Sequence, residues 1–339
     1  MKISMIGLDI AKNVFQVHGV DEAGEVTLRK KLRRRDVLSF FAAQEPCVVA
    51  MEACGTAHHW ARELAALGHE VRLVPPSYVK AYVKRSKNDA VDAAAIYEAA
   101  SRPSMRFVPV KTLERQAALV PHRVRDMLVR QRTMLINALR SQMAEFGVVV
   151  PKGRHRLGEL IAMLREDQGI PASARTMLME LVGAIEALTP RVDRIEKAIV
   201  AAVRMDPLAR RLTTVPGVGP ITASALAAMV GDPARFRNGR HFAAWLGLVP
   251  RQSSTGGKQR LGRISKMGDK YLRKLLVLGA TASLRRAPST DRLALWTRGL
   301  LDRRPARLVT VALANKMARI AWAVMARGQA YRPETAAAA

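Results

Sequence analysis

Cysteine is scarce in this chain of 339 residues, and long hydrophobic runs are absent. The two cysteines, Cys47 and Cys54, lack the spacing of a zinc site, and their small number favours a reduced, cytoplasmic setting. No uninterrupted apolar run reaches the roughly 18 residues that a membrane-spanning helix needs, so we expect no membrane partner. The first residues, MKISMIGLDIAK, reach Asp9 too early for a signal peptide.

Negative charge is also in short supply. The chain has 28 Asp and Glu against 56 Lys and Arg, which gives a net charge of +28. An excess of this size implies a polyanionic partner, and nucleic acid is favoured over an anionic membrane surface. With 49% hydrophobic residues, the chain is nonetheless apolar enough to bury the cores of two or three domains.

The first 110 residues have the pattern of an α/β domain. Alternating and apolar stretches predict strands at 2–9, 14–20, 25–30, 47–52 and 70–74, and helical spacing predicts helices at 35–44, 57–67 and after Pro75-Pro76. Three consecutive strands followed by alternating helices and strands are typical of a ribonuclease H-like fold. We therefore expect a ribonuclease H-like domain over 1–110.

The rest of the chain is expected to be mainly helical. Residues 111–205 combine Ala, Leu, Arg and Glu with apolar residues at helical spacing, which predicts long paired helices and a coiled coil. A helical subdomain without an assembly role is the alternative. Residues 206–330 form a third block, and the low-complexity tail 331–339 is expected to be disordered.

Four acidic residues stand where a ribonuclease H-like fold would bring them together. Asp9 and Glu52 each end a predicted strand, and Asp89 and Asp92 share one face of a predicted helix. Converging carboxylates repel each other and need a cation, and Mg²⁺ prefers carboxylate and phosphate oxygens. The pattern therefore predicts a Mg²⁺ site that acts on phosphate. The cations just before the helix, Lys84, Arg85 and Lys87, would receive a nucleic-acid backbone.

Each of these acidic residues also has a plainer interpretation. Asp89 suits the first turn of a helix that Ser86 or Asn88 caps. Asp9 suits a turn, and Glu52 suits a solvated strand end. The order of the four residues along the predicted elements is what favours a shared site.

A glycine-rich turn lies in VPGVGPITASAL, at residues 215–226. One interpretation is a helix-hairpin-helix, in which the turn at Gly217 and Gly219 offers backbone N–H groups to a DNA phosphate. A nucleotide-binding loop fits less well, because Thr222 occupies the last glycine position of that pattern. A plain connection between helices is the third interpretation.

The segment RQSSTGGKQRLGRISK, at residues 251–266, combines hydroxyl groups, glycines and cations. A nucleophilic hydroxyl there would have cations beside it to stabilise a phosphate under attack, and a distant carboxylate cluster could serve as the base. The alternative is a flexible loop that binds phosphate without specificity. The cations expected to bind nucleic acid are Arg251, Lys258, Arg260, Arg263 and Lys266.

Together these motifs resemble the transposases of the insertion-sequence-110 family, most closely its 1111 subgroup. The resemblance covers nearly the whole chain and is carried by GLDIAKN, MEACGTAHHW, KNDAVDA and the long run from VPGVGPITA to GDKYLRKLL. It implies a RuvC-like domain whose acidic tetrad, Asp9, Glu52, Asp89 and Asp92, binds Mg²⁺. It also implies a coiled-coil segment and a C-terminal transposase domain with a catalytic serine.

The resemblance further implies a DNA recombinase guided by a structured noncoding RNA. It would act on element ends and target DNA as a homo-oligomer, a dimer or tetramer, in which a serine of one protomer meets the acidic cluster of another. The serine is assigned to Ser254, although Ser253 is adjacent and the register is open by one residue. We expect a cytoplasmic, nucleoid-associated protein. A Holliday-junction-type endonuclease that uses water, and a nucleic-acid-binding protein without chemistry, are the alternatives.

Overall fold

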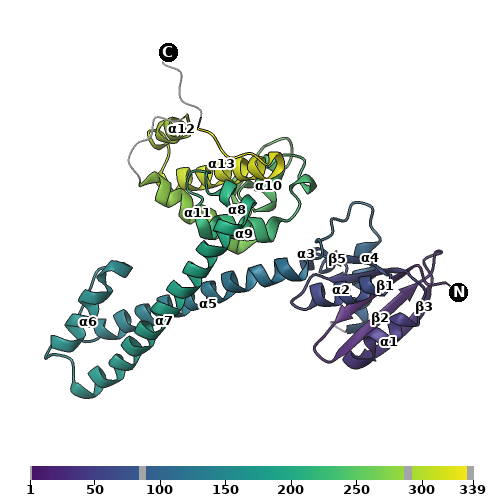
Figure 1. Cartoon of the computed structure of the whole chain (residues 1–339), viewed down its shortest axis with the longest axis horizontal. Helices are drawn as coiled ribbons and strands as arrows, with labels where there is room; N and C mark the ends of the chain where they lie inside the picture. The colour runs from purple at the N-terminus through teal and green to yellow at the C-terminus, as the bar shows by residue number, and fades with distance from the viewer. Residues whose placement is uncertain (1, 84–88, 286–291, 334–339) are drawn as a thin grey trace, which may run out of the picture. The chain divides into compact units, whose positions relative to one another are not determined.

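The computed structural model describes residues 2–83, 89–285 and 292–333 (Figure 1). The chain divides into two compact units, an N-terminal unit of residues 1–114 and a C-terminal unit of residues 115–339. The C-terminal unit contains the predicted coiled-coil segment from residue 115 onward and the whole of the predicted transposase domain. A boundary between those two near residue 205 stays a prediction.

The N-terminal unit is built on one five-stranded sheet with the order β3-β2-β1-β4-β5. The strands are β1 (Met5–Ile10), β2 (Val14–Val20), β3 (Val26–Arg33), β4 (Val48–Glu52) and β5 (Glu70–Val74). Strands β1, β2 and β3 form an antiparallel meander, whereas β4 and β5 run parallel to β1. This mixed α/β arrangement is compatible with a ribonuclease H-like domain.

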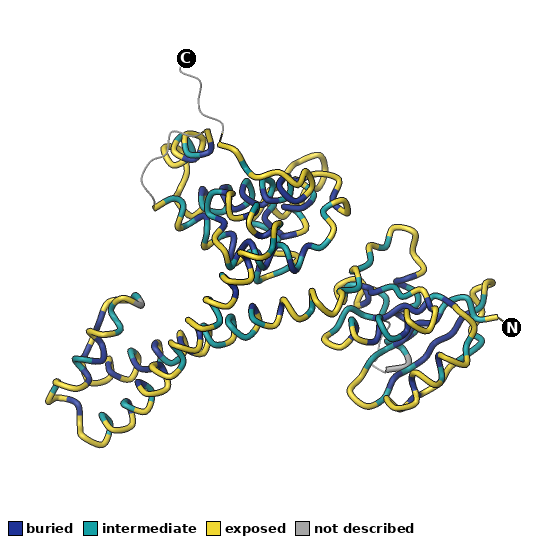
Figure 2. The backbone as a smooth tube through the Cα atoms, viewed as in Figure 1, coloured by how far each residue is buried: buried dark blue, intermediate teal, exposed yellow. Residues whose placement is uncertain are grey.

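Helices cover both faces of this sheet because side chains alternate along each strand. On one face, Ile6 and Leu8 of β1 belong to a hydrophobic cluster with residues of α1 (Val37–Ala42) and α2 (Ala57–Ala66). On the other face, residues of α3 (Pro76–Val79) and α4 (Asp89–Ala100) form a second cluster with β4 and β5. Figure 2 shows buried positions, in dark blue, along the strands between these helices.

The predicted strand order is confirmed, but one strand end was wrong. Strand β3 runs to Arg33 rather than ending near residue 30, and the 3-10 helix η1 (Arg34–Asp36) follows it. The end of β3 cannot be recognised in the sequence RKKLRRR, because β3 is an edge strand whose side chains are mostly exposed and show little polarity pattern. Only Leu32 keeps the alternation of a half-buried strand there.

Two long helices open the C-terminal part of the chain. Helix α5 (Leu113–Ala144) and α7 (Ala172–Met205) pack with α6 (Leu157–Glu166), which follows the 3-10 helix η2 (Arg154–Arg156). The three α-helices share a hydrophobic cluster that includes Leu139, Leu164 and Val182. The predicted long helices are therefore present, whereas a coiled coil stays a prediction.

The remaining helices enclose the largest hydrophobic cluster of the C-terminal unit. These helices are α8 (Pro207–Leu212), α9 (Pro220–Val230), the 3-10 helix η3 (Pro233–Arg235), α10 (Gly239–Trp245), α11 (Lys270–Leu284), α12 (Arg292–Leu301) and α13 (Ala306–Arg327). A two-stranded hairpin of β6 (Pro250–Gln252) and β7 (Leu261–Ile264) is inserted between α10 and α11.

Helix α13 also bears on the expectation of no membrane partner. Within the described residues it is the one helix that is long and apolar enough, by length and composition, to cross a membrane. Its buried side chains, including Leu313, Met317 and Ala321, belong to the core of the C-terminal unit. A central helix of a packed core is expected to be this apolar.

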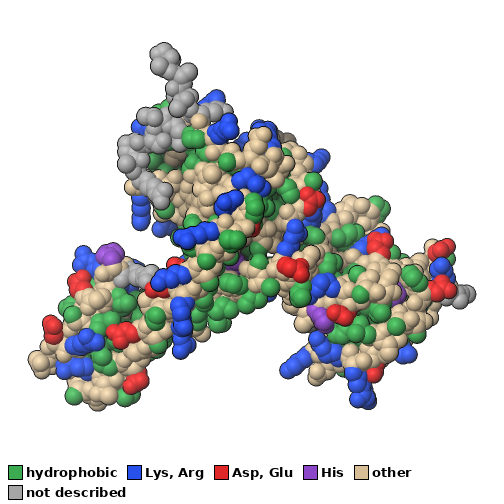
Figure 3. All heavy atoms as spheres, viewed as in Figure 1, with side chains coloured by type: hydrophobic (Ala, Val, Ile, Leu, Met, Phe, Trp, Pro, Cys, Tyr) green, Lys and Arg blue, Asp and Glu red, His purple; other side chains and the backbone are tan. Residues whose placement is uncertain are grey.

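The positive charge is unevenly divided between the two units. Residues 115–339 contain 39 Lys and Arg against 15 Asp and Glu, whereas residues 1–114 contain 17 and 13. In Figure 3, blue Lys and Arg side chains are scattered over the helices of the C-terminal unit. A polyanion would therefore be attracted mainly to that unit.

Candidate active site

Two of the predicted acidic residues lie at neighbouring strand ends. Strand β1 pairs in parallel with β4, and the last registered pair is Leu8 with Met51. One residue further along each strand are Asp9 and Glu52, so the two carboxylates emerge beside each other at the carboxyl edge of the sheet. The parallel register achieves this across 43 residues of sequence.

Helix α4 lies on the face of the sheet toward which these carboxylates point. Gly7 is two residues before Asp9 and therefore shares its face. A Cβ atom on Gly7 would lie 2.2 Å from the carbonyl oxygen of Ala93, so the helix and the strand meet backbone against backbone. Asp92, the residue before Ala93, is thereby brought to the acidic strand ends.

The electrostatics of Glu52 reflect this proximity. Glu52 and Asp92 are both half-buried. Burial raises the pKa of the Glu52 carboxyl, and the negative charge of Asp92 raises that pKa further. The structure thus brings together two carboxylates, from β4 and α4, that repel each other when both are ionised.

The structure says less about the other residues that were predicted for this site. Asp89 is the first residue of α4, three residues before Asp92 on the same helix. Lys84, Arg85 and Lys87 lie outside the described residues. Among the described side chains, which do not include that of Asp89, no three His, Cys, Asp or Glu residues gather closely enough to form a metal site. The metal-binding role of the acidic residues stays a prediction.

The serine segment forms the hairpin of β6 and β7. Gly256 and Gly257 occupy its turn with φ of 56° and 74°, and Thr255 pairs with Lys258 across it. Positive φ at both central residues is typical of a type I′ turn, which matches the twist of paired strands. The hairpin residues from Arg251 to Arg263 are all exposed.

Ser254 has specific partners within this hairpin. Its Oγ accepts a hydrogen bond from the Gln252 side-chain amide at 3.0 Å and one from the Arg260 backbone N–H at 3.3 Å. These two donors hold the Ser254 oxygen while its own proton remains available to a base. The neighbouring Ser253 is held by its backbone instead, since its N–H donates to the Arg260 carbonyl at 2.9 Å.

The base of the hairpin is tied to the core. The Ser265 N–H donates to the Val249 carbonyl at 2.8 Å, and the Lys266 N–H donates to the Gly247 carbonyl at 3.1 Å. The predicted cations lie along the hairpin and, for Lys266, just after it, and they are all exposed: Arg251, Lys258, Arg260, Arg263 and Lys266. The hairpin therefore places Ser254 among exposed cations, and backbone hydrogen bonds hold the base of the hairpin to the preceding segment.

The glycine turn joins α8 to α9, and a helix-hairpin-helix stays a prediction. Gly217 has a φ of 78° and packs against α11, where a Cβ atom would lie 2.9 Å from the Gly279 carbonyl oxygen. Gly219 is exposed and immediately precedes α9. A phosphate could therefore approach Gly219 more easily than Gly217, whose α carbon packs against the core.

Two residues that shape these sites were not predicted from the sequence. Gly7 sets the distance between β1 and α4, and Gln252 donates to the Ser254 hydroxyl. The position of Gly7 inside an apolar strand was an available signal, because such a glycine often marks a close approach of another backbone. No signal in the sequence distinguished Gln252.

Comparisons with known proteins agree with this arrangement. A DEDD-type family profile described as transposase matches residues 6–147, and the profile of the transposase IS116/IS110/IS902 family matches residues 209–294. The first range contains Asp9, Glu52, Asp89 and Asp92, and the second contains Ser254.

Close relatives extend over the whole chain. The chain is 55% identical to a probable family 20 transposase of Pseudomonas aeruginosa, over 98% of this chain and 100% of the relative. It is 43% identical to the transposase for insertion sequence element IS1328 of Yersinia enterocolitica, over 97% and 98%. It is 40% identical to the transposase for insertion sequence element IS1111A of Coxiella burnetii, over 97% and 92%. The chain therefore belongs to the IS116/IS110/IS902 family of transposases.

Proposed function

We propose that this transposase cuts and rejoins DNA through Ser254, with Mg²⁺ held by Asp9, Glu52, Asp89 and Asp92. The observation that carries the proposal is the approach of α4 to β1 at Gly7, because it brings Asp92 to Glu52 at the strand ends. Partly buried carboxylates that repel each other are enriched at functional sites, which supports a chemical role for this pair. The resulting activity moves the protein's own insertion sequence.

The donor set suits a divalent cation. Glu52 and Asp92 raise the free energy of the protein when both are ionised, and a bound cation removes that repulsion. Carboxylate oxygens are the ligands that Mg²⁺ prefers. When bound, Mg²⁺ supplies Lewis-acid polarisation of a phosphate and lowers the pKa of an attacking hydroxyl. Asp9 and Asp89 complete the proposed set of ligands.

The serine would act as the nucleophile. Its Oγ attacks phosphorus, so that a serine–phosphate ester bond forms while a bond from phosphorus to a deoxyribose oxygen breaks. The serine proton passes to a carboxylate of the acidic cluster, and the departing deoxyribose oxygen takes up a proton. Attack by a new DNA hydroxyl reverses the step and frees Ser254, so rejoining needs no ATP. The cations of the hairpin stabilise the charge on the phosphate.

The partners and the assembly are proposed from the family resemblance. We propose a structured noncoding RNA as the guide, with DNA at the element ends and at the target as the substrates. The active form would be a homo-oligomer, a dimer or tetramer, in which the hairpin of one protomer meets the acidic cluster of another. The α8–α9 turn would act as a helix-hairpin-helix at Gly219, and a coiled coil of α5 and α7 would support assembly.

A structure-specific nuclease of the Holliday-junction type is the second candidate. The hydroxyl of Ser254 accepts two hydrogen bonds inside the hairpin, as expected also of a residue that only shapes a loop. In that case water attacks the phosphate. The acidic cluster alone then carries the chemistry, and the hairpin only clamps the backbone.

A covalent intermediate distinguishes the two candidates. Purified protein is mixed with the element-derived RNA, Mg²⁺ and labelled junction DNA, then denatured and mapped by peptide mass. An adduct on Ser254, absent from Ser254→Ala and retained by Ser253→Ala, would support the proposal. An adduct on Ser253 would move the nucleophile by one residue. Cleavage by Ser254→Ala at the wild-type rate, without an adduct, would favour the nuclease.

A further inference from the structure

A pocket in the C-terminal unit, lined by residues outside the serine hairpin, carries a further assignment. It lies where α10 packs on α13 and has a volume of about 400 Å³. Its lining comes from the start of α10 and from α13, and it includes Arg240, Arg319, Ile320, Trp322 and Ala323. The pocket is an open depression on the surface, which suits a strand lying across it more than an enclosed small molecule.

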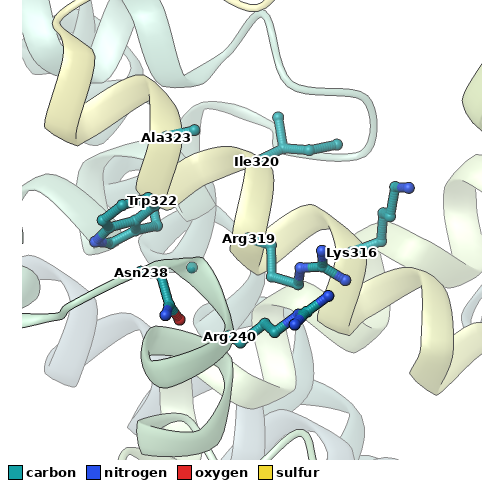
Figure 4. Close-up of a pocket in the computed structure, with 8 residues that line it drawn as sticks. Asn238, Arg240, Lys316, Arg319, Ile320, Trp322 and Ala323 are labelled. Carbon is teal, nitrogen blue, oxygen red and sulfur yellow. The ribbon is translucent and has the colours of Figure 1, made fainter.

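One end of the pocket is cationic. In Figure 4 the side chains of Arg240 and Arg319 extend from their helices toward each other, whereas the Lys316 side chain, three residues earlier on α13, extends away from them. No ion pair joins any of these three cations to a carboxylate within the described residues. Neighbouring guanidinium groups repel each other, so an anion between them would lower the free energy of the site.

Apolar side chains of α13 flank the two arginines. The Trp322 indole N–H donates to the Pro233 carbonyl at 3.1 Å, which fixes the ring, and Ile320 and Ala323 line the pocket on another side of the same helix (Figure 4). The Lys316 ammonium lies 5.2 Å from the Trp296 ring centroid, a cation–π contact. The pocket thus pairs fixed apolar side chains with a group of positive charges.

We propose that this pocket binds a phosphodiester of a nucleic-acid strand, with the phosphate between Arg240 and Arg319 and the sugar or base toward Ile320 and Ala323, which share one side of α13. The planar guanidinium groups match phosphate oxygens in pairs, which makes arginine suited to this role. The assignment rests on the proposed function, in which the chain handles DNA and a guide RNA. DNA and RNA share this chemistry, so the experiment has an arm for each.

The test compares binding by two double variants. Arg240→Gln/Arg319→Gln removes two cations from the pocket, and the control Arg307→Gln/Arg327→Gln removes two exposed cations from the ends of α13. Affinities for element-end duplex DNA and for element-derived RNA are measured over a range of salt concentrations. Circular dichroism melting establishes that both variants fold.

For the pocket variant we expect roughly a tenfold or greater loss of affinity at moderate salt, because charged hydrogen bonds to phosphate are lost. The slope of log affinity against log salt should fall by about two for duplex DNA. The control should lose about threefold or less, as expected for diffuse surface charge. A loss confined to DNA, or to RNA, identifies the strand that the pocket holds.

Equal losses in the two double variants would overturn the assignment. A third variant, Arg240→Lys/Arg319→Lys, keeps the charge but not the paired donors, and it should recover part of the affinity. Failure of the proposed function looks different. A wild-type protein that binds DNA and RNA but never forms the serine adduct would overturn the serine chemistry and leave the pocket assignment standing.

Discussion

Gly7 of β1 and Ala93 of α4 meet backbone against backbone, with only 2.2 Å between the Ala93 carbonyl oxygen and the position that a Cβ atom on Gly7 would take. Any side chain at residue 7 would push α4 away from the sheet. Since Asp92 precedes Ala93 on that helix, the same contact sets the distance from Asp92 to the strand ends at Asp9 and Glu52.

Replacing Gly7 should therefore damage both stability and strand cleavage. In Gly7→Ala the added methyl meets backbone atoms, and overpacking of this kind costs about 1–3 kcal/mol of unfolding free energy. We expect a lower melting temperature and reduced DNA cleavage. Gly55→Ala is the matched control, because a Cβ there meets nothing within 4 Å. Wild-type behaviour of Gly7→Ala would contradict the proposed spacing.

Asp92→Asn should make the metal-free protein more stable and inactive. The change removes the charge that raises the pKa of Glu52, so that pKa falls toward its ordinary value. A raised acid pKa destabilises the fold once pH exceeds the ordinary carboxyl value, and near neutral pH the variant should melt at a higher temperature. NMR titration of the Glu52 side chain and thermal melting measure these two effects.

Magnesium should stabilise the wild-type protein more than the Asp92→Asn variant. Because Mg²⁺ would relieve the repulsion between Glu52 and Asp92, it should raise the melting temperature of the wild-type protein more than that of Asp92→Asn. Glu22→Gln, which neutralises an exposed carboxylate outside the site, should respond to Mg²⁺ as the wild type does. Equal shifts in all three proteins would argue against a cation at these carboxylates.

The turn of the hairpin offers a test of the serine that leaves the core untouched. Replacing Gly256 and Gly257 by two alanines forces non-glycine residues to adopt positive φ, at a cost of about 1–2 kcal/mol each. We expect loss of cleavage and of the serine adduct with little change in the melting temperature, because the hairpin is exposed. An Asn-Gly turn should restore both activities. Full activity of the two-alanine variant would show that the hairpin geometry is dispensable.

His122 should make the stability of the C-terminal unit depend on pH. Its ring nitrogens lie 3.2 Å from the Tyr271 hydroxyl and 3.0 Å from the Ser224 hydroxyl, and burial together with Arg125 lowers its pKa to about 4. An unfolded histidine titrates near 6.5 and binds its proton first as pH falls. The unfolding free energy should therefore fall by up to about 3 kcal/mol between pH 7 and 4.

Denaturant unfolding at a series of pH values measures this effect. His122→Gln keeps polar atoms at the site but has no group that titrates in this range. Its pH profile should be flatter than that of the wild type by the histidine contribution. Identical profiles for the two proteins would mean that other groups, not His122, set the acid sensitivity.

The sequence predicted the strands β1 and β4 but did not predict β6 and β7, and the reason is the difference in their burial. Strands β1 and β4 are buried on both faces, so their apolar runs end visibly at Asp9 and Glu52. Strands β6 and β7 have almost no buried face, and their side chains carry no alternation of polarity from which a strand can be recognised. Only backbone pairing defines that hairpin.

The sequence by itself determined the charge, the order of strands and helices, and the chemical types of the predicted site residues, because these depend on composition and local periodicity. Tertiary structure alone decided which of them meet. The approach of α4 to Gly7 places Asp92 beside Glu52, and the packing of α10 on α13 brings Arg240 to Arg319 across 79 residues of chain. Contacts between distant residues depend on how whole faces fit together, and no local pattern in the chain records that fit.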